Sequence, residues 1–284
     1  MLQGSIVALV TPMRADGSID WEAHERLVRW HVESGTAGVV PMGTTGESAT
    51  LNTHEHLEVI SRTIEVANGR ISVVAGTGSN STEETLHQTK EAESLGADAC
   101  LLVTPYYNRP TQEGLYAHFK KVAETTSVPL VLYNVPGRTG CDLLPETIGR
   151  LSSIEGIVGI KEASGKIERV SEIRSVSASD FFILSGEDAL TLEMMNNGAV
   201  GTISVTANVL PKAMAEFCDS FLSGNIKRAS AIDEVLQSVH EILFVESNPT
   251  PAKWALHQMG MIQEGIRMPL LPLSSRHRSE LKKR

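Results

Sequence analysis

Short apolar runs alternate with amphipathic stretches along most of this chain. The apolar and β-branched runs predict strands at residues 5–10, 37–41, 71–75, 100–104, 130–134, 158–161, 182–185 and 200–205. Helical spacing of apolar residues predicts helices at 20–34, 53–67, 82–95, 112–125, 145–151, 167–176, 188–196 and 211–222. Such alternation favours an α/β fold, and eight strand-then-helix units favour a (β/α)₈ TIM barrel over an open sheet.

The alternation stops near Gly224. Residues 226–243 form one long amphipathic pattern, and a second helix is expected after Asn248-Pro249, ending at Gly260. We therefore predict a catalytic barrel domain at residues 1–224 and a C-terminal helical region at 225–284. The helical region should pack on the barrel, because its apolar stripe needs a partner surface.

Composition narrows the classes of partner. The 284 residues carry a net charge of -9, which disfavours nucleic acid and anionic membranes. The three cysteines are widely spaced and odd in number, which argues for a reducing compartment. No apolar run is long enough to span a bilayer and no secretory signal is visible, so we expect a cytoplasmic protein. No His, Cys and carboxylate spacing predicts a metal site.

The stretch from Ile157 to Gly165 is the strongest chemical signal. It reads as a buried strand that ends on Lys161, with small and polar residues next. Burial favours the neutral form of an amine, which is the form that attacks a ketone. Lys161 is therefore a candidate Schiff-base nucleophile. The alternative is a strand-end lysine whose stem covers apolar surface while its head reaches water.

Other strand ends carry polar side chains. Tyr133 lies at the carboxyl end of the predicted strand before that of Lys161. In a barrel this places the two side chains within hydrogen-bond reach, and a phenol can shuttle protons. Alternatively, Tyr133 is a core residue whose hydroxyl bonds backbone. The turn Gly43-Thr44-Thr45-Gly46-Glu47 offers hydroxyls and backbone donors for a small carboxylate. The alternative is a loop whose threonines cap the next helix.

Three further residues lie in loops that follow strands. Arg138 has the planar fork that grips a carboxylate, although a solvated arginine is the plain alternative. Tyr106 and Tyr107 are two of only four tyrosines and predict a site or an interface. Ser81 to Glu84 reads as a helix capping box, which alone would explain Glu84.

Taken together, these motifs resemble the dihydrodipicolinate synthase family of pyruvate-dependent class I aldolases and lyases. The resemblance covers nearly the whole chain and rests on Gly43-Thr44-Thr45-Gly46-Glu47, Tyr106-Tyr107, Tyr133-Asn134-Val135-Pro136, Arg138 and Ile160-Lys161-Glu162. It implies a lyase that condenses pyruvate with L-aspartate 4-semialdehyde through a lysine Schiff base, in the diaminopimelate route of lysine biosynthesis. No metal or organic cofactor is implied, because the amine acts as the electron sink.

The resemblance also implies a role for each matching residue. Lys161 would form the Schiff base with pyruvate, and Tyr133 would transfer protons through a relay with Thr44 and with Tyr107 of a neighbouring subunit. Thr45 would bind the pyruvate carboxylate, helped by main-chain contacts at Gly186 and Ile203, and Arg138 would hold the carboxylate of the second substrate. The role of Tyr107 requires a homo-oligomer, expected by resemblance to be a tetramer built as a dimer of dimers.

Some family members are inhibited by L-lysine in a cleft between subunits. Residues like those of the lysine-sensitive enzymes stand here at Ser48, Ala49, His56, Asn80, Glu84 and Tyr106. The chain departs from that pattern at Thr53, where such enzymes often have histidine. The resemblance thus implies an L-lysine site and leaves its sensitivity open.

Two alternatives remain open from the sequence. A sister aldolase acting on a sialic acid or a 2-keto-3-deoxy sugar acid would share Lys161, Tyr133 and the glycine-threonine turn. Arg138 and Tyr107 favour the synthase reaction, because sugar acids call for groups that match hydroxyls. A barrel that binds small ligands without catalysis is the third reading, and it predicts no covalent adduct.

Overall fold

A computed structural model of the chain describes residues 2–282. Its strands are β1 (Gly4–Ala8), β2 (Gly38–Val40), β3 (Ser72–Gly76), β4 (Ala99–Val103), β5 (Leu130–Asn134), β6 (Ile157–Glu162), β7 (Phe182–Ser185) and β8 (Gly201–Ser204). They form a closed barrel in the order β1 to β8, in which neighbouring strands from β1 to β8 pair in parallel. The predicted TIM barrel is therefore confirmed, with strand ends that differ from the predicted ones by at most two residues.

Helices follow the strands in the predicted places. They are α1 (Trp21–Glu33), α2 (Thr53–Ala67), α3 (Thr82–Leu95), α4 (Gln112–Ala123), α5 (Pro136–Thr139), α6 (Pro145–Leu151), α7 (Glu168–Val176), α8 (Thr191–Asn196), α9 (Pro211–Leu222), α10 (Ile226–Ile242), α11 (Thr250–Gln258) and α12 (Ser275–Leu281). The pattern did not predict the single turn α5, and the helix expected at 188–196 is divided into a 3₁₀ turn at Asp188–Leu190 and α8. The C-terminal helical region is present as α10 to α12.

The chain packs as two compact units, and the boundaries between them fall inside β3 and β8. One unit contains Val74–Ile203, and the other contains Gly4–Val73 together with the segment that starts at Ser204. This division by packing does not test the predicted boundary between residues 224 and 225, which stays a prediction.

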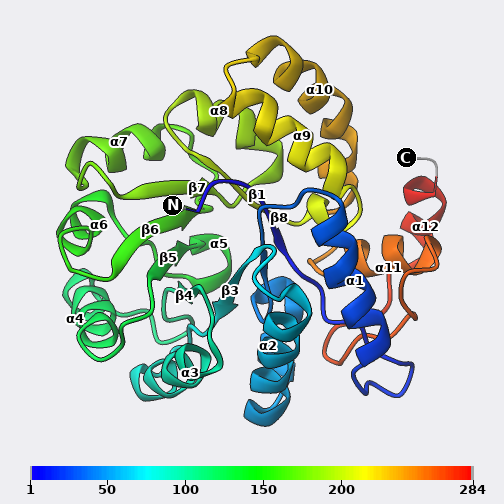
Figure 1. Ribbon diagram of the computed structural model, residues 1–284, viewed down its shortest axis with the longest axis horizontal. Coiled ribbons are helices and arrows are strands. Elements are labelled where there is room, and N and C mark those ends of the chain that lie inside the picture. Colours follow the sequence, from blue (N-terminus) through cyan, green and yellow to red (C-terminus); the bar gives the residue numbers. More distant parts are fainter. Residues whose placement is uncertain (1, 283–284) are drawn as a thin grey trace. The chain divides into compact units, whose positions relative to one another are not determined.

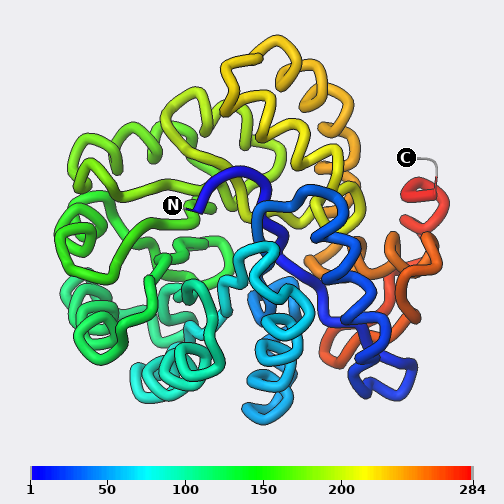
Figure 2. Tube along the Cα trace, in the orientation of Figure 1, coloured from blue at the N-terminus to red at the C-terminus, as the bar shows by residue number. Residues whose placement is uncertain are grey.

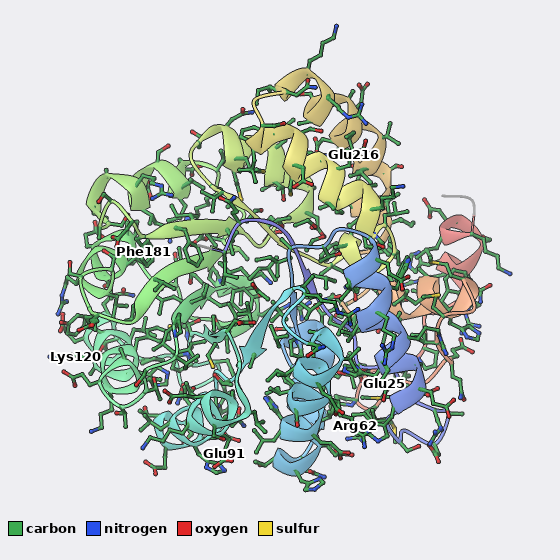
Figure 3. The ribbon with its side chains drawn as sticks, viewed as in Figure 1. Glu25, Arg62, Glu91, Lys120, Phe181 and Glu216 are labelled. Atoms are coloured by element: carbon green, nitrogen blue, oxygen red, sulfur yellow. The ribbon has the colours of Figure 1, made fainter. Side chains whose placement is uncertain are left out.

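In the unit of Val74–Ile203, β4 to β7 lie side by side and α3, α4, α6 and α7 lie around them (Figure 1). Helix α4 shows why: Leu115, Phe119 and Val122 form a stripe at helical spacing that is completely buried. Lys120 of α4 and Glu91 of α3 point to the outside (Figure 3). The strands are buried on both faces, as parallel strands covered by helices must be.

In the other unit, the two ends of the chain are joined around β1. The Asn208 side chain donates to the carbonyl of Ala8 at 2.8 Å and accepts from the amide of Val10 at 3.0 Å. Helix α9 packs against both β1 and α10, and α1 packs against α2, as the tube in Figure 2 traces. Residues about two hundred positions apart in sequence thus share one core.

Among the described residues, 2–282, there is neither a membrane-spanning helix nor a cluster of metal-binding side chains. None of their helices is long and apolar enough to cross a membrane. They also contain no group of three or more His, Cys, Asp or Glu side chains that could hold a metal ion.

Helix α1 buries two histidines that make stability depend on pH. His24 Nε2 lies 2.9 Å from the Thr63 hydroxyl, and His31 Nδ1 lies 3.1 Å from the Thr36 hydroxyl. Burial lowers the pKa of His31 from 6.5 to about 3, and burial followed by the charge of Arg62 lowers that of His24 to about 4. Below pH 6.5 the unfolded chain therefore binds protons that the folded chain does not.

We predict that the free energy of unfolding falls between pH 6 and pH 4 by about 1.4 kcal/mol per pH unit for each such histidine. Replacing His31 by Gln should lower the slope of unfolding free energy against pH by the contribution of one histidine, about 1.4 kcal/mol per pH unit. Urea unfolding at fixed protein concentration measures this slope. His87→Gln, an exposed position on α3, is the matched control and should keep the wild-type slope. Equal slopes for wild type and His31→Gln would contradict the assignment.

Candidate active site

Lys161 lies at the end of β6 and is 6% exposed. It pairs in register with Tyr133 of β5, and its Nζ atom lies 4.3 Å from the centre of the Tyr133 ring. The structure thus brings the predicted nucleophile and the predicted proton shuttle together, with the amine over the face of the ring. An aromatic face attracts a cation without donating or removing a proton.

Gly186 provides the next wall of this site. It follows β7, and its amide donates to the carbonyl of Glu162 at 2.8 Å. A β-carbon at this position would lie 2.6 Å from the β-carbon of Ala163 and 2.9 Å from Cε of Lys161. Only a residue without a side chain fits here while the lysine keeps its position.

The next residue, Glu187, was not singled out from the sequence. Burial raises the pKa of its carboxyl group, and the charges of Lys161 and Arg138 only partly offset this effect. The Gly186-Glu187-Asp188 segment follows a strand end, and two acids at that place are the sequence signal by which Glu187 could have been found. It places a carboxyl group in the electrostatic field of both predicted cationic residues.

Behind Lys161, its neighbour Glu162 is fully buried and points to the opposite side of the strand. Glu162 accepts from the Asn134 side chain at 3.1 Å and from the amide of Ser164 at 2.7 Å, yet burial still raises the pKa of its carboxyl group. Asn134 also donates to Asp142 at 2.9 Å. Arg169 binds both oxygens of Asp142, at 2.9 and 3.0 Å.

This network was missed from the sequence because its members are scattered over four elements or loops. Burial would raise the pKa of Asp142, but the hydrogen bonds from Arg169 and Asn134 outweigh it and hold that pKa below its usual value. The network joins the ends of β5 and β6, the two strands that carry Tyr133 and Lys161. It therefore fixes their relative position from behind.

The other predicted residues of this unit lie after β4, on α5 and in β8. Tyr107 is 90% exposed, has a left-handed backbone with φ of 72°, and donates its amide to the carbonyl of Thr139 at 3.2 Å. A non-glycine residue in this region costs free energy and persists only where its surroundings hold it. Arg138 lies exposed on α5. Ile203 is buried in β8.

The turn after β2 lies in the other compact unit. Thr44 begins a 3₁₀ turn, Thr45 within it is 3% exposed, and Glu47 follows with φ of 58°. Asn248 donates its side-chain amide to the Thr45 hydroxyl at 2.8 Å. The threonines do not cap α2, whose cap is Asn52, so the plain alternative for this turn is wrong.

The predicted lysine-site residues are divided between the two units. Asn80 donates its side-chain amide to the carbonyl of Tyr106 at 3.2 Å, so these two lie together. The Glu84 carboxylate accepts from the Ser79 hydroxyl at 2.6 Å, whereas Ser81 caps the amide of Glu84 at 3.4 Å. The expected capping box is thus formed in one direction only. In the other unit, Ser48 is half-buried, Ala49 exposed and His56 buried.

Comparisons with known proteins give a consistent result. The model of the dihydrodipicolinate synthetase family matches residues 1–284. The 4-hydroxy-tetrahydrodipicolinate synthase of Methylococcus capsulatus is 57% identical over 275 residues, which cover 97% of this chain and 94% of that protein.

Two solved structures are similar over the full length. The chloride inhibited dihydrodipicolinate synthase from Acinetobacter baumannii, complexed with pyruvate, gives a TM-score of 0.98 at 52% identity and covers 100% of this chain and 97% of that one. The dihydrodipicolinate synthase from Cyanidioschyzon merolae with lysine bound gives 0.96 at 38% identity, covering 99% and 96%.

The buried network makes a testable demand on stability. Arg169→Met should lower the free energy of unfolding by about 2–4 kcal/mol, because the Asp142 carboxylate beside Glu162 loses its arginine partner. Partial exposure of Asp142 keeps this loss below that of a fully buried pair. Arg150→Met is the matched control, since Arg150 binds both oxygens of Glu113 but both side chains are exposed. Urea unfolding should show a much smaller change for Arg150→Met, and equal changes would refute the structural role of the network.

Proposed function

The chain belongs to the dihydrodipicolinate synthetase family. We propose that it has the activity for which its curated relatives are named, that of a 4-hydroxy-tetrahydrodipicolinate synthase. It condenses pyruvate with L-aspartate 4-semialdehyde, a step of the diaminopimelate route to lysine. The observation that carries the proposal is the buried Lys161 amine held over the ring of Tyr133.

In the reaction we propose, the Lys161 amine attacks the ketone carbon of pyruvate. The carbinolamine loses water to give an imine, and loss of a methyl proton gives an enamine that attacks the aldehyde carbon of the second substrate. The amino group of that substrate then attacks the imine carbon, closes the ring and displaces Lys161. The protonated imine stores the electron pair released by the methyl carbon, so the chemistry needs no cofactor.

The other predicted residues serve binding and proton transfer in this proposal. Tyr133 moves the protons of carbinolamine formation and dehydration, together with Thr44 and a partner subunit's Tyr107. Thr45 and the main chain at Gly186 and Ile203 bind pyruvate. Arg138 binds the carboxylate of the second substrate, which its fork fits in two parallel hydrogen bonds. The exposure and strained backbone of Tyr107 support its place at an interface.

Three further properties belong to this proposal. The protein is a homo-oligomer, expected to be a tetramer, because Tyr107 acts in a neighbouring subunit. It works in the cytoplasm, which the free and buried thiols of Cys100, Cys141 and Cys218 support. L-Lysine binds at the six residues named above, supported by the contact of Asn80 with Tyr106 and by the relative that has lysine bound.

Borohydride reduction in the presence of pyruvate tests the covalent step. We expect a stable pyruvate adduct on Lys161, located by peptide mass spectrometry, and none in Lys161→Ala, which should fold normally and lose nearly all activity. Lys166→Ala, an exposed lysine nearby in sequence, is the control and should keep the adduct. An unmodified Lys161 at saturating pyruvate would support a barrel that binds ligands without catalysis.

Tyr133→Phe tests the proton shuttle. It should slow turnover of pyruvate with L-aspartate 4-semialdehyde by about 10²–10⁴-fold, because a positioned proton donor is lost while the ring remains under the amine. Tyr116→Phe on α4 is the control and should keep the wild-type rate. Wild-type turnover by Tyr133→Phe would contradict the role, and turnover only of N-acetylmannosamine in place of the semialdehyde would identify a sugar-acid aldolase.

A further inference from the structure

The turn that carries Thr45 is held by residues from the far end of the same compact unit. Its last residue, Glu47, has a left-handed backbone, and its side chain is fully buried. Glu47 Oε1 accepts from Nζ of Lys253 on α11, and Oε2 accepts from the amide of Arg267 at 3.0 Å. A buried carboxylate needs such partners, and together they fix the end of the turn.

Asn248 provides a second attachment between the C-terminal segment and this turn. Its side-chain amide donates to the Thr45 hydroxyl at 2.8 Å, and both residues are buried. Because Lys253 is only five residues further along the chain, the ion pair with Glu47 also holds Asn248 against the turn. The two contacts connect one short C-terminal segment to both ends of the Thr45–Glu47 stretch.

The direction of the bond to Thr45 has a chemical consequence. An amide nitrogen can only donate, so the Thr45 oxygen accepts and keeps its own hydrogen for another acceptor. A substrate carboxylate is such an acceptor, since an ionised carboxylate only accepts hydrogen bonds. Asn248 therefore sets the hydroxyl in the direction that a carboxylate requires.

We infer that Asn248 is a positioning residue for substrate binding: it orients the Thr45 hydroxyl as a donor to the pyruvate carboxylate, and the Glu47–Lys253 pair holds it there. The inference rests on the proposed function, which gives Thr45 its substrate. It assigns part of the pyruvate site to the C-terminal helical region, which the sequence motifs did not connect with chemistry.

Steady-state kinetics of Asn248→Ala with pyruvate varied is the first test. The KM for pyruvate should rise about tenfold, the size expected when a hydrogen bond to a charged group is weakened, while kcat and the KM for L-aspartate 4-semialdehyde stay within about twofold. Asn225→Ala, which removes the asparagine cap of α10, is the matched control and should leave the pyruvate KM unchanged. An unchanged pyruvate KM in Asn248→Ala would overturn the inference.

A double-mutant cycle separates orientation of the hydroxyl from general support of the fold. Thr45→Val removes the hydroxyl while keeping the shape, so adding Asn248→Ala to it should change the pyruvate KM by less than about twofold. If the two changes multiply instead, Asn248 does not act through Thr45 and the inference fails.

Asn248→Asp covers the case in which the alanine variant does not fold. Its carboxylate accepts the Thr45 hydrogen and reverses the bond, so the pyruvate KM should rise at least as much as in Asn248→Ala. A pyruvate KM equal to that of wild type would overturn the inference. Borohydride trapping on the wild-type protein distinguishes failure of the proposed function from failure of this inference. If Lys161 carries no adduct, both fail. If Lys161 carries the adduct but the Asn248 variants keep the wild-type KM for pyruvate, only this inference fails.

Discussion

The structure of the candidate site depends on one constraint, that an amine placed inside the protein must lose its water. Lys161 is 6% exposed, its Nζ atom lies 4.3 Å from the centre of the Tyr133 ring, and Gly186 lies beside its Cε atom. None of these supplies the compensation that a carboxylate partner would give to a buried charge. The ring of Tyr133 attracts the cationic form of the amine. Lys161 thus combines a buried amine with an aromatic face, and its proposed role as a nucleophile rests on this arrangement.

Three charged side chains, Glu162, Asp142 and Arg169, form a network behind the strand of Lys161. Because successive side chains of a strand point to opposite faces, Glu162 faces away from the amine and into the network of Asn134, Asp142 and Arg169. That network holds the ends of β5 and β6 in register without placing a carboxylate against the amine. Rigidity and chemistry are therefore divided between the two faces of one strand. A single residue shift of β6 would exchange them, which is why its pairing with β5 matters.

The periodicity of the chain was sufficient for the barrel, because strands buried on both faces and helices with one apolar stripe leave distinct patterns. Lys161 and Tyr133 could be found because each polar residue ends an apolar run. Arg169 left no such signal and Glu187 only its place after a strand end, since an acid or arginine in a loop or helix is common and only burial and contacts make these two unusual. The pattern around Asn248 predicts only helices. The partner of Asn248, Thr45, is about two hundred residues away, a separation that no local pattern encodes.

Two buried lysines in this chain show why burial alone does not identify a nucleophile. Lys253 is 4% exposed, less than Lys161, and burial lowers the pKa of its amine despite the opposing charge of Glu47. Its Nζ is nevertheless hydrogen-bonded to a carboxylate that is itself fully buried, so the space a keto acid would need is already occupied. At Lys161 the corresponding neighbour is Gly186, where a side chain would collide with the lysine stem. The contrast between the two lysines therefore lies in their neighbours: the Lys253 amine is bonded to a buried carboxylate, whereas the Lys161 amine lies over an aromatic ring and has a glycine beside its stem.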